Sequence, residues 1–226
     1  MKIHQSTISL LQSFSQISSN LLIKRGNKIT TRNAGNSIQA RATVQEDFPE
    51  QFAIYDLNQF LSLIGISHDP ELEFGDKSLT IKSASGGEIE YFYADPSLIV
   101  STSENIPTLE KIFTFSVTSS DITTITKTAS IVSATMMSII SNNSITTLSI
   151  NDPKNPTSHS FTKVLGDCDK SFNIKMSIDS FKVVPDNYNV HIAHATAKSG
   201  KVLVFFFEST TRDLTYLIAA DTSSKI

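Results

Sequence analysis

A short pattern occurs twice in this sequence, once in each half. Residues 54–60 (IYDLNQF) align with residues 175–181 (KMSIDSF), 121 positions further along the chain. Each copy leads from an apolar strand pattern into a short helix through a residue that can cap it, Asp56 in the first copy and Ser177 in the second. A pattern repeated at about half the chain length predicts two similar domains.

A second element recurs in the same order. Residues 1–19 have one apolar helical stripe, which consists of Ile3, Leu10, Leu11, Phe14, Ile17 and then Leu21. In the second half, Ser120 is expected to cap a helix from Asp121 to about Ser133. Its stripe consists of Ile122, Ile125, Ala129, Val132 and Met136. Either match alone is open to chance, but two elements in the same order favour a duplication.

The rest of the chain reads mainly as strands and turns. Alternating or apolar runs predict strands at 21–24, 28–32, 38–44, 52–55, 172–176, 188–193, 201–208 and 214–220. We therefore expect an α+β fold of two similar domains, each with two helices packed on antiparallel sheets. The expected boundaries are 1–94 for the first domain and 111–226 for the second. Residues 95–110 contain two prolines and little periodicity, so they are expected to form the connector.

Composition excludes several classes of protein. The 226 residues are 39% hydrophobic, which is enough for a core, and the single cysteine, Cys168, excludes a disulfide scaffold. The longest wholly apolar run, 202–207, is too short for a membrane helix. Residues 1–45 contain six basic residues and no acid, which would also suit a cleaved transit peptide. Strand patterns follow directly from residue 21, so we favour a folded first helix.

The sequence contains no evident catalytic or metal-binding constellation. The five histidines (His4, His68, His159, His191 and His194) are scattered. His191 and His194 share a predicted strand, where positions three apart face opposite sides. Gly86-Gly87 is isolated and forms no phosphate-binding loop, and Cys168 lies between two aspartates that would suppress thiol reactivity, so a surface turn is the preferred interpretation there. We expect a protein that is not an enzyme and has no cofactor or bound metal.

The helix faces opposite the apolar stripes are polar and carry little charge. The first face comprises Lys2, Gln5, Ser9, Gln12 and Gln16, and the second comprises Ser120, Thr123, Thr124, Lys127, Ser130 and Ala134. If both helices pack on sheets, these faces are free for solvent or for a polymer. Taken by themselves, they fit an ordinary solvated surface best.

Residues 52–61 (FAIYDLNQFL), 94–97 (ADPS) and 165–167 (LGD) resemble the sliding clamps of T-even-type tailed bacteriophages, which are DNA polymerase processivity factors. The resemblance extends from Met1-Lys2 through 185–188 (PDNY) to 219–221 (AAD), so it covers essentially the whole chain. No single motif is diagnostic. The order and spacing of the motifs, together with the duplication, make the resemblance specific.

The resemblance implies a DNA clamp fold and a head-to-tail homotrimer that encircles duplex DNA without sequence preference. It implies a replicative DNA polymerase, an ATP-driven clamp loader and late-transcription factors as partners, in the cytoplasm of an infected bacterium, with no membrane contact. The expected DNA-channel residues are Lys2, Gln5, Gln12, Gln16, Thr123, Lys127, Ser130 and Lys182. The expected pocket for partner peptides comprises Ile106, Pro107, Leu109, Leu217 and Ile218.

The chain departs from the family at the first helix, where Gln5 and Gln12 replace lysines that the resemblance leads us to expect. This predicts either weaker attraction to the duplex or a contribution from cations near the rim, namely Lys24, Arg25, Arg32 and Arg41. The acid-rich segment 46–113 is expected on the outside of the ring, and an ordinary solvated charged face explains it equally well. The competing interpretations are a structural β-rich virion protein from a tail or baseplate and, more remotely, a small DNA-modifying enzyme. The repeated helices argue against the first and the lack of a site against the second.

Overall fold

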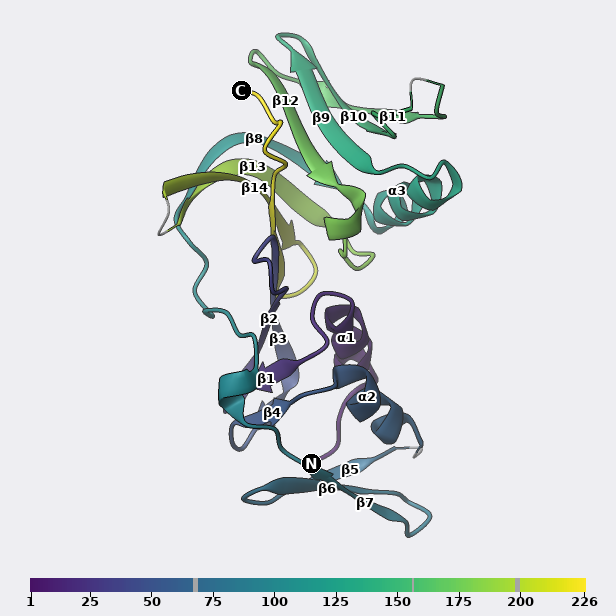
Figure 1. The fold of residues 1–226 in the computed structure, drawn as a ribbon, viewed down its shortest axis with the longest axis vertical. Coiled ribbons are helices and arrows are strands. Elements are labelled where there is room, and N and C mark those ends of the chain that lie inside the picture. The colour runs from purple at the N-terminus through teal and green to yellow at the C-terminus, as the bar shows by residue number, and fades with distance from the viewer. Residues whose placement is uncertain (67–68, 156, 198–199) are drawn as a thin grey trace. The chain divides into compact units, whose positions relative to one another are not determined.

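The computed structural model describes residues 1–66, 69–155, 157–197 and 200–226. The chain divides into two compact units, Met1–Asn105 and Ile106–Ile226 (Figure 1). The described residues form three α-helices, two 3-10 helical turns and fifteen strands. The sheets in both units are antiparallel. The expected α+β class is confirmed, but the expectation of two helices in each domain is wrong for the second unit.

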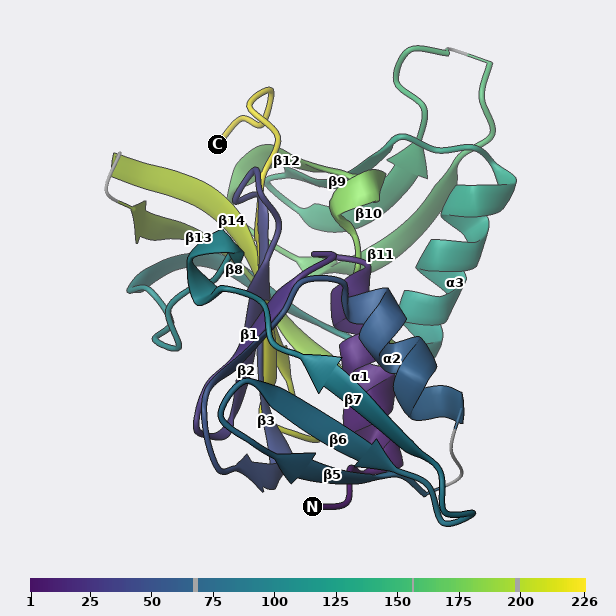
Figure 2. The ribbon, with the colours of Figure 1, turned by 60° about the horizontal axis from the view of Figure 1, so that its bottom comes forward.

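The first unit pairs two helices with short antiparallel strands. Its elements are α1 (Gln5–Ser15), β1 (Leu21–Ile23), β2 (Gly26–Arg32), β3 (Ile38–Phe48), β4 (Phe52–Ile54), α2 (Leu57–Ile66), β5 (Glu71–Phe74), β6 (Ser78–Lys82), β7 (Glu88–Phe92) and the 3-10 turn η1 (Pro96–Leu98). Strand β1 pairs with β4, β2 pairs with β3, and β5, β6 and β7 form a meander. Helices α1 and α2 contact each other and lie side by side in Figures 1 and 2.

Helix α1 follows the predicted stripe but is shorter than predicted. Thr7, Leu10, Leu11 and Phe14 are buried at the i, i+3, i+4, i+7 spacing of one helix face. The helix begins only at Gln5 because the first residues pair with β5 instead. The Met1 amino group donates to the carbonyl of Leu72 at 2.7 Å, and Lys2 forms an isolated β-bridge with Glu71.

Helix α2 begins at the predicted turn. The Asp56 carboxylate accepts the backbone N–H of Gln59 at 3.0 Å, which satisfies a free donor of the first helical turn. Phe60 then enters an aromatic core, where its ring centroid lies 5.0 Å from that of Tyr91 and 6.4 Å from that of Phe52. Such tilted ring pairs add to the stabilisation from burial.

The second unit contains one α-helix and longer strands. Its elements are β8 (Leu109–Val117), α3 (Ser119–Ile131), β9 (Met136–Asn142), β10 (Ile145–Asn151), β11 (Phe161–Asp167), β12 (Ser171–Ser177), the 3-10 turn η2 (Ile178–Ser180), β13 (Tyr188–Ala197), β14 (Gly200–Ser209) and β15 (Leu214–Ala219). One sheet has the order β11-β10-β9-β12, and strands β15, β14, β13 and β8 are successive neighbours in another. Helix α3 contacts β10, with Ile122, Ile125 and Ala129 buried.

Two local predictions for this unit need correction. The N-cap of α3 is Thr118 and not Ser120. The Thr118 hydroxyl accepts the N–H of Asp121 at 3.2 Å, while the Asp121 carboxylate accepts the N–H of Thr118 at 3.0 Å, so the two residues form a capping box. Ser177 caps as predicted, but the element that follows it is the single turn η2 and not an α-helix.

Candidate functional site

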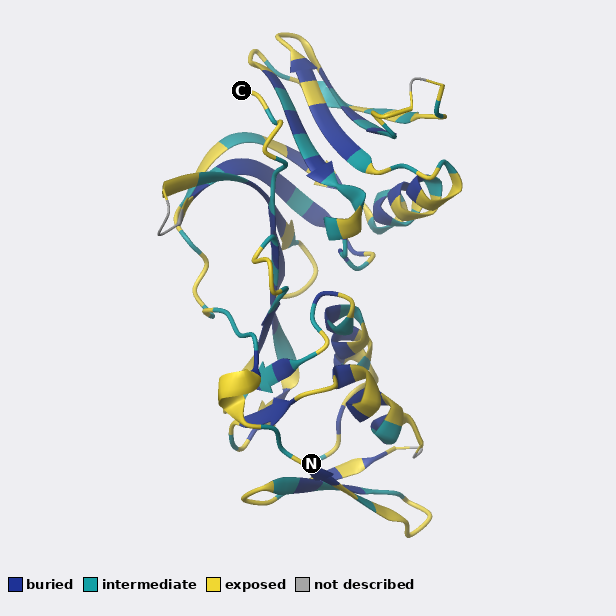
Figure 3. Cartoon of the chain, in the orientation of Figure 1, coloured by how far each residue is buried: buried dark blue, intermediate teal, exposed yellow. Residues whose placement is uncertain are grey.

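The outward face of α1 is exposed and made of amides and hydroxyls. Gln5, Gln12 and Gln16 are all exposed, and the helical period places them on the side opposite the buried stripe. Figure 3 shows buried and exposed residues alternating along α1. Gln16 is the C-cap residue, whose backbone N–H donates to the carbonyl of Ser13 at 3.1 Å. These three predicted residues therefore share one polar surface. Helix α2 beside them contributes the exposed Asn58 and Gln59.

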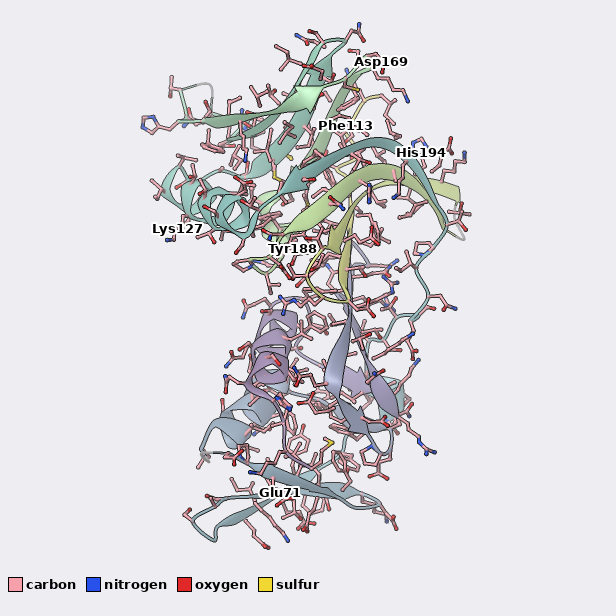
Figure 4. The ribbon with its side chains drawn as sticks, turned by 180° about the vertical axis from the view of Figure 1, so that it is seen from behind. Glu71, Phe113, Lys127, Asp169, Tyr188 and His194 are labelled. Atoms are coloured by element: carbon pink, nitrogen blue, oxygen red, sulfur yellow. The ribbon has the colours of Figure 1, made fainter. Side chains whose placement is uncertain are left out.

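The face of α3 is similar but includes one cation. Lys127 and Ser130 are exposed, and Lys127 points away from the helix into solvent (Figure 4). Thr123 is half-buried, and its hydroxyl donates to the carbonyl of Ser119 at 3.0 Å. Lys182 lies outside the helix, in the segment after η2, and is half-buried. The structure thus brings Thr123, Lys127 and Ser130 together on one helix.

Lys2 does not belong to these free surfaces. Its ammonium group is hydrogen-bonded to the Asp69 carboxylate, and this contact raises the pKa of Lys2. A lysine held by an acid offers little net charge to a phosphate. No local sequence pattern signals this pairing, because the two residues are 67 positions apart in the chain.

Each unit has a sheet with one edge strand that no other strand covers. Strand β7 is at the edge of the β5-β6-β7 sheet and β11 at the edge of the four-stranded sheet, in the described part of the chain. Each of these strands exposes a large apolar side chain, Phe92 at 66% and Val164 at 63%. A cavity of about 390 Å³ adjoins β7 and includes Tyr55, which is also well exposed.

Comparisons with known proteins agree with this architecture. A family model described as DNA polymerase processivity factor matches residues 2–106. The sliding clamp of Vibrio phage KVP40 is 28% identical over 199 residues, which cover 85% of this chain and 90% of the relative. The sliding clamp of Escherichia phage RB69 is 26% identical over 235 residues, covering 99% and 98%. The chain is a phage sliding clamp of the DNA polymerase processivity factor family.

Solved structures support the fold of this clamp. A. fulgidus PCNA, in a structure with the C-terminal region of FEN-1 bound, aligns with a TM-score of 0.68 at 14% identity, over 96% of each chain. Proliferating Cellular Nuclear Antigen from Entamoeba histolytica aligns with a TM-score of 0.65 at 14% identity, over 95% of this chain and 94% of that one. At this identity the likeness shows the fold alone. The family is that of non-enzymatic processivity factors, which agrees with the expected lack of catalysis.

Three of the four cations that we expected near the clamp's rim bind the connector instead. The Arg32 Nε atom donates to the carbonyl of Ser101 at 2.6 Å, and the Arg41 Nε atom donates to the carbonyl of Ser103 at 2.9 Å. Lys24 forms an ion pair with Glu104 at 3.3 Å. We call these three contacts the connector clasp. They join residues that are 62 to 80 positions apart, so no local sequence pattern predicts them.

Arg41 is the most deeply buried member of the connector clasp. Its side chain is mostly buried, and burial lowers its pKa. A guanidinium remains protonated under such conditions, and its donors need acceptors. The second contact, from Nη2 to the Gln39 amide oxygen at 2.7 Å, supplies one.

The predicted partner-peptide residues of the clamp fall into three environments. Leu109 packs against an apolar cluster formed by Ala193, Ala195, Val204, Phe206 and Leu217, so Leu109 and Leu217 lie together. Ile106 is 47% exposed and Pro107 is half-buried. Ile218 is fully buried and follows Leu217 in β15, so it faces the other side of the sheet. We therefore remove Ile218 from the proposed pocket.

A buried histidine adjoins the same cluster. The His191 ring stacks on Phe206 at 6.0 Å between centroids. Its Nδ1 atom lies 2.8 Å from the Thr114 hydroxyl, and its Nε2 atom lies 3.2 Å from the Lys111 ammonium and 3.4 Å from the Glu208 carboxylate. Burial and the nearby Lys111 lower the pKa of His191, while Glu208 opposes them. The neutral ring accepts from Lys111 through Nε2.

The other candidate residues show no arrangement for chemistry. His191 and His194 belong to the same strand, and no group of metal-ligating side chains forms within the described ranges. His68 lies outside the described residues. Cys168 lies in the turn between β11 and β12, where its backbone N–H donates to the carbonyl of Ser144 at 2.8 Å. Among the described residues, none of the helices has the length and apolar character that a membrane crossing needs.

Proposed function

We propose that three copies of this clamp close head to tail into a ring around duplex DNA, where the ring tethers the phage's replicative DNA polymerase. The two open sheet edges carry this proposal. A ring of identical subunits needs two different, complementary surfaces on each copy. Strands β7 and β11 are two such surfaces, one in each unit.

The opposite edges of the same two sheets are already covered by the ends of the chain. The β-bridge from Lys2 to Glu71 covers part of β5, and the β-bridge from Lys225 to Asn173 covers part of β12. Unpaired edges attract other strands and are normally blocked. Since one edge is covered and the other left open in both sheets, we infer that β7 and β11 serve assembly.

Each of the two open strands exposes a large apolar side chain. Strand β7 exposes Phe92 next to Glu88 and Glu90. Strand β11 exposes Val164 next to Thr162, while Lys163 between them is bound to Asp121 of α3. Pairing these strands antiparallel would satisfy their free backbone groups and bury Phe92 and Val164.

Light scattering over a range of concentrations tests the ring. We expect a species of about 74 kDa, three times the 24.8 kDa of one chain, that dissociates on dilution. Phe92→Asp and Val164→Asp should each shift the equilibrium toward monomer. Leu98→Asp is the matched control, because Leu98 is 61% exposed but lies in η1, away from both edges. A concentration-independent monomer would favour the alternative of a structural virion protein.

The proposed DNA-facing surface consists of the polar faces of α1 and α3 together with Lys182 after η2. Its residues are Gln5, Gln12, Gln16, Thr123, Lys127, Ser130 and Lys182. Amide and hydroxyl side chains hydrogen-bond phosphates and water without selecting a base sequence, which suits a protein that moves along DNA. Lys127→Ala and Lys182→Ala should weaken DNA-dependent stimulation of the polymerase while leaving the native mass unchanged. Full stimulation at low salt would exclude these lysines from the DNA-facing surface.

The surface around the connector is the proposed site for partner peptides. It comprises Ile106, Pro107, Leu109 and Leu217, and the connector itself is assigned to residues 95–110 between domains 1–94 and 111–226. The bound FEN-1 segment in the archaeal PCNA structure supports a peptide-binding role for this fold. Ile106→Asp should reduce binding of the polymerase's C-terminal peptide, measured by calorimetry. Ile145→Asp is the control, because Ile145 is similarly exposed on β10.

Other proteins are expected to load the ring onto DNA and to regulate it. We assign ring opening to an ATP-driven clamp loader, because this chain has no phosphate-binding loop in its sequence. Contacts with late-transcription factors would use the same surface around the connector. The expected location is the cytoplasm of the infected bacterium, where the polymerase works. Pull-down of loader subunits from an infected-cell extract, with Ile106→Asp as the comparison, tests these partners.

A further inference from the structure

The helices of both units carry almost no charge. Neither α1 nor α2 contains a single Asp, Glu, Lys or Arg. Helix α3 contains one acid and one base, Asp121 and Lys127. In the turn that replaces a second helix in that unit, Asp179 is followed closely by Lys182. The α-helices of each unit therefore have a net formal charge of zero, and Lys182 offsets the charge of Asp179 in η2.

Pairing leaves little of this charge free. Asp121 is hydrogen-bonded to the ammonium group of Lys163. Lys127 is exposed and forms no ion pair with any described residue. Lys2, which would extend the α1 face, is bound to Asp69. Among the described helical residues, Lys127 is therefore the one exposed cation without an ion pair in each chain, and the half-buried Lys182 after η2 also forms no ion pair with a described residue.

The basic N-terminal segment offers little replacement. Arg32 and Arg41 donate to the connector carbonyls of Ser101 and Ser103, and Lys24 is paired with Glu104. These groups stabilise the connector, so they are occupied in the folded chain. Residues 1–45 contain six cations, but these six do not form one free surface for phosphates.

We infer that the face which this clamp presents to DNA is a neutral, hydrated track of amides and hydroxyls. The inference rests on the proposed ring, in which the helices line the channel. Attraction of proteins to DNA scales with the number of phosphates that cations neutralise, because counterions are then released. Glutamine, serine and threonine contact phosphates directly or through water and release none. Closure of the ring, and not attraction to phosphates, keeps this clamp on the duplex.

The salt dependence of binding tests this inference. Affinity for a short linear duplex, followed by fluorescence anisotropy, should be weak and should fall with salt with a log–log slope of no more than about 5, from Lys127 and Lys182 of the three chains. Lys127→Ala and Lys182→Ala should each flatten the slope further. A steeper slope, with a loss of more than about ten-thousandfold between roughly 50 and 200 mM salt that both variants leave unchanged, would overturn the inference and point to another cationic surface.

A gain-of-charge variant sharpens the test. Gln5→Lys with Gln12→Lys adds up to six lysines to the track of a trimer, and both positions are exposed, so folding should be unaffected. The slope should steepen by up to about 5. Gln45→Lys with Gln51→Lys adds the same charge at exposed positions outside the helices, and should change the slope much less, because Gln45 faces the side of β3 opposite to Glu46, the residue that contacts α1. Equal effects of the two pairs would show that net charge alone matters, which would also overturn the inference.

A second experiment distinguishes failure of the proposed ring from failure of the neutral track. Clamps loaded onto linear duplex should remain when both ends are blocked by bound protein and slide off when the ends are free, at high salt in both cases. Equal loss from both substrates would reject the ring itself. Retention on blocked ends combined with a steep salt slope would keep the ring and reject only the neutral track.

Discussion

The two units begin their repeated motif in the same way and continue it differently. After Asp56, the residues Leu57, Phe60, Leu61 and Ile64 extend a buried stripe through the whole of α2. After Ser177, Ile178 and Phe181 match the first two of these, but Val183, Val184 and Pro185 follow. Proline cannot continue a helix and disfavours helical conformation in the residue before it. The same start therefore gives a helix in one unit and the single turn η2 in the other.

This difference teaches that a repeat specifies where an element begins more reliably than how long it is. A cap and one apolar contact fix the start, whereas each further turn needs its own buried residue. The first unit thus packs two helices against each other, and the second relies on α3 with longer strands.

The largest test of the comparison removes the shared phenylalanine from each unit. Phe60→Ala should lower the free energy of unfolding by about 3–5 kcal/mol, because Phe60 is 1% exposed within an aromatic core. Phe181→Ala should cost less, since Phe181 is 8% exposed and has one ring contact, with Phe207. Denaturant titrations of both variants measure the difference. Equal losses would mean that the single turn η2 is as important to its unit as α2 is to the first.

A smaller effect is expected at the starts of the equivalent helices α1 and α3. Thr118→Ala removes the capping hydroxyl of α3 and should cost about 1 kcal/mol. Helix α1 has no side-chain cap of its own, and the Glu46 carboxylate from β3 accepts the Thr7 hydroxyl at 2.6 Å instead. Thr7→Val should therefore cost at least as much, because it leaves a buried carboxylate oxygen without that donor. Thermal melts of the two variants provide the comparison. Thr124→Ala serves as the control, because Thr124 is exposed on α3. An unchanged melting temperature for Thr7→Val would show that α1 does not need the contact between Thr7 and Glu46.

The smallest effect concerns pH and is confined to the second unit. The pKa of His191 is lowered from 6.5 by burial and Lys111, so below about pH 6.5 the unfolded chain binds more protons than the folded one. The contribution of His191 to stability is therefore complete above that pH and is lost as the pH falls toward the folded pKa. His191→Gln should flatten the stability profile between about pH 7 and 5. The exposed His159→Gln is the control, and an unchanged slope for His191→Gln would assign the profile to other groups.

Sequence patterns predicted the features that depend on near neighbours. The α1 stripe, the Asp56 cap and the exposure of Gln5 and Gln12 follow from periodicity alone. The Thr118 capping box also has a sequence pattern, since Thr118 and Asp121 have the required spacing. The sequence prediction nevertheless placed the cap of α3 at Ser120. The sequence analysis assigns no range to the seven strands β5 to β11, and in β5 (ELEF) and β7 (EIEYF) charges interrupt the short apolar runs.

Sequence patterns could not predict the contacts between residues that are far apart in the chain. Arg32 and Arg41 looked like free cations because nothing local marks the connector carbonyls as their partners. Lys2 looked free for the same reason, although Asp69 binds it. A charge counted in the sequence becomes a charge available to DNA only where folding leaves it unpaired.

The covered sheet edges have a consequence for how many ways this protein can associate. With β5 and β12 partly covered by β-bridges from Lys2 and Lys225, each of these two sheets keeps one open edge, β7 or β11. Copies that join only through these two edges can form linear oligomers or closed cycles, and never branched networks. A closed cycle would pair every β7 with a β11, so it would leave neither of these edges open for the addition of further copies.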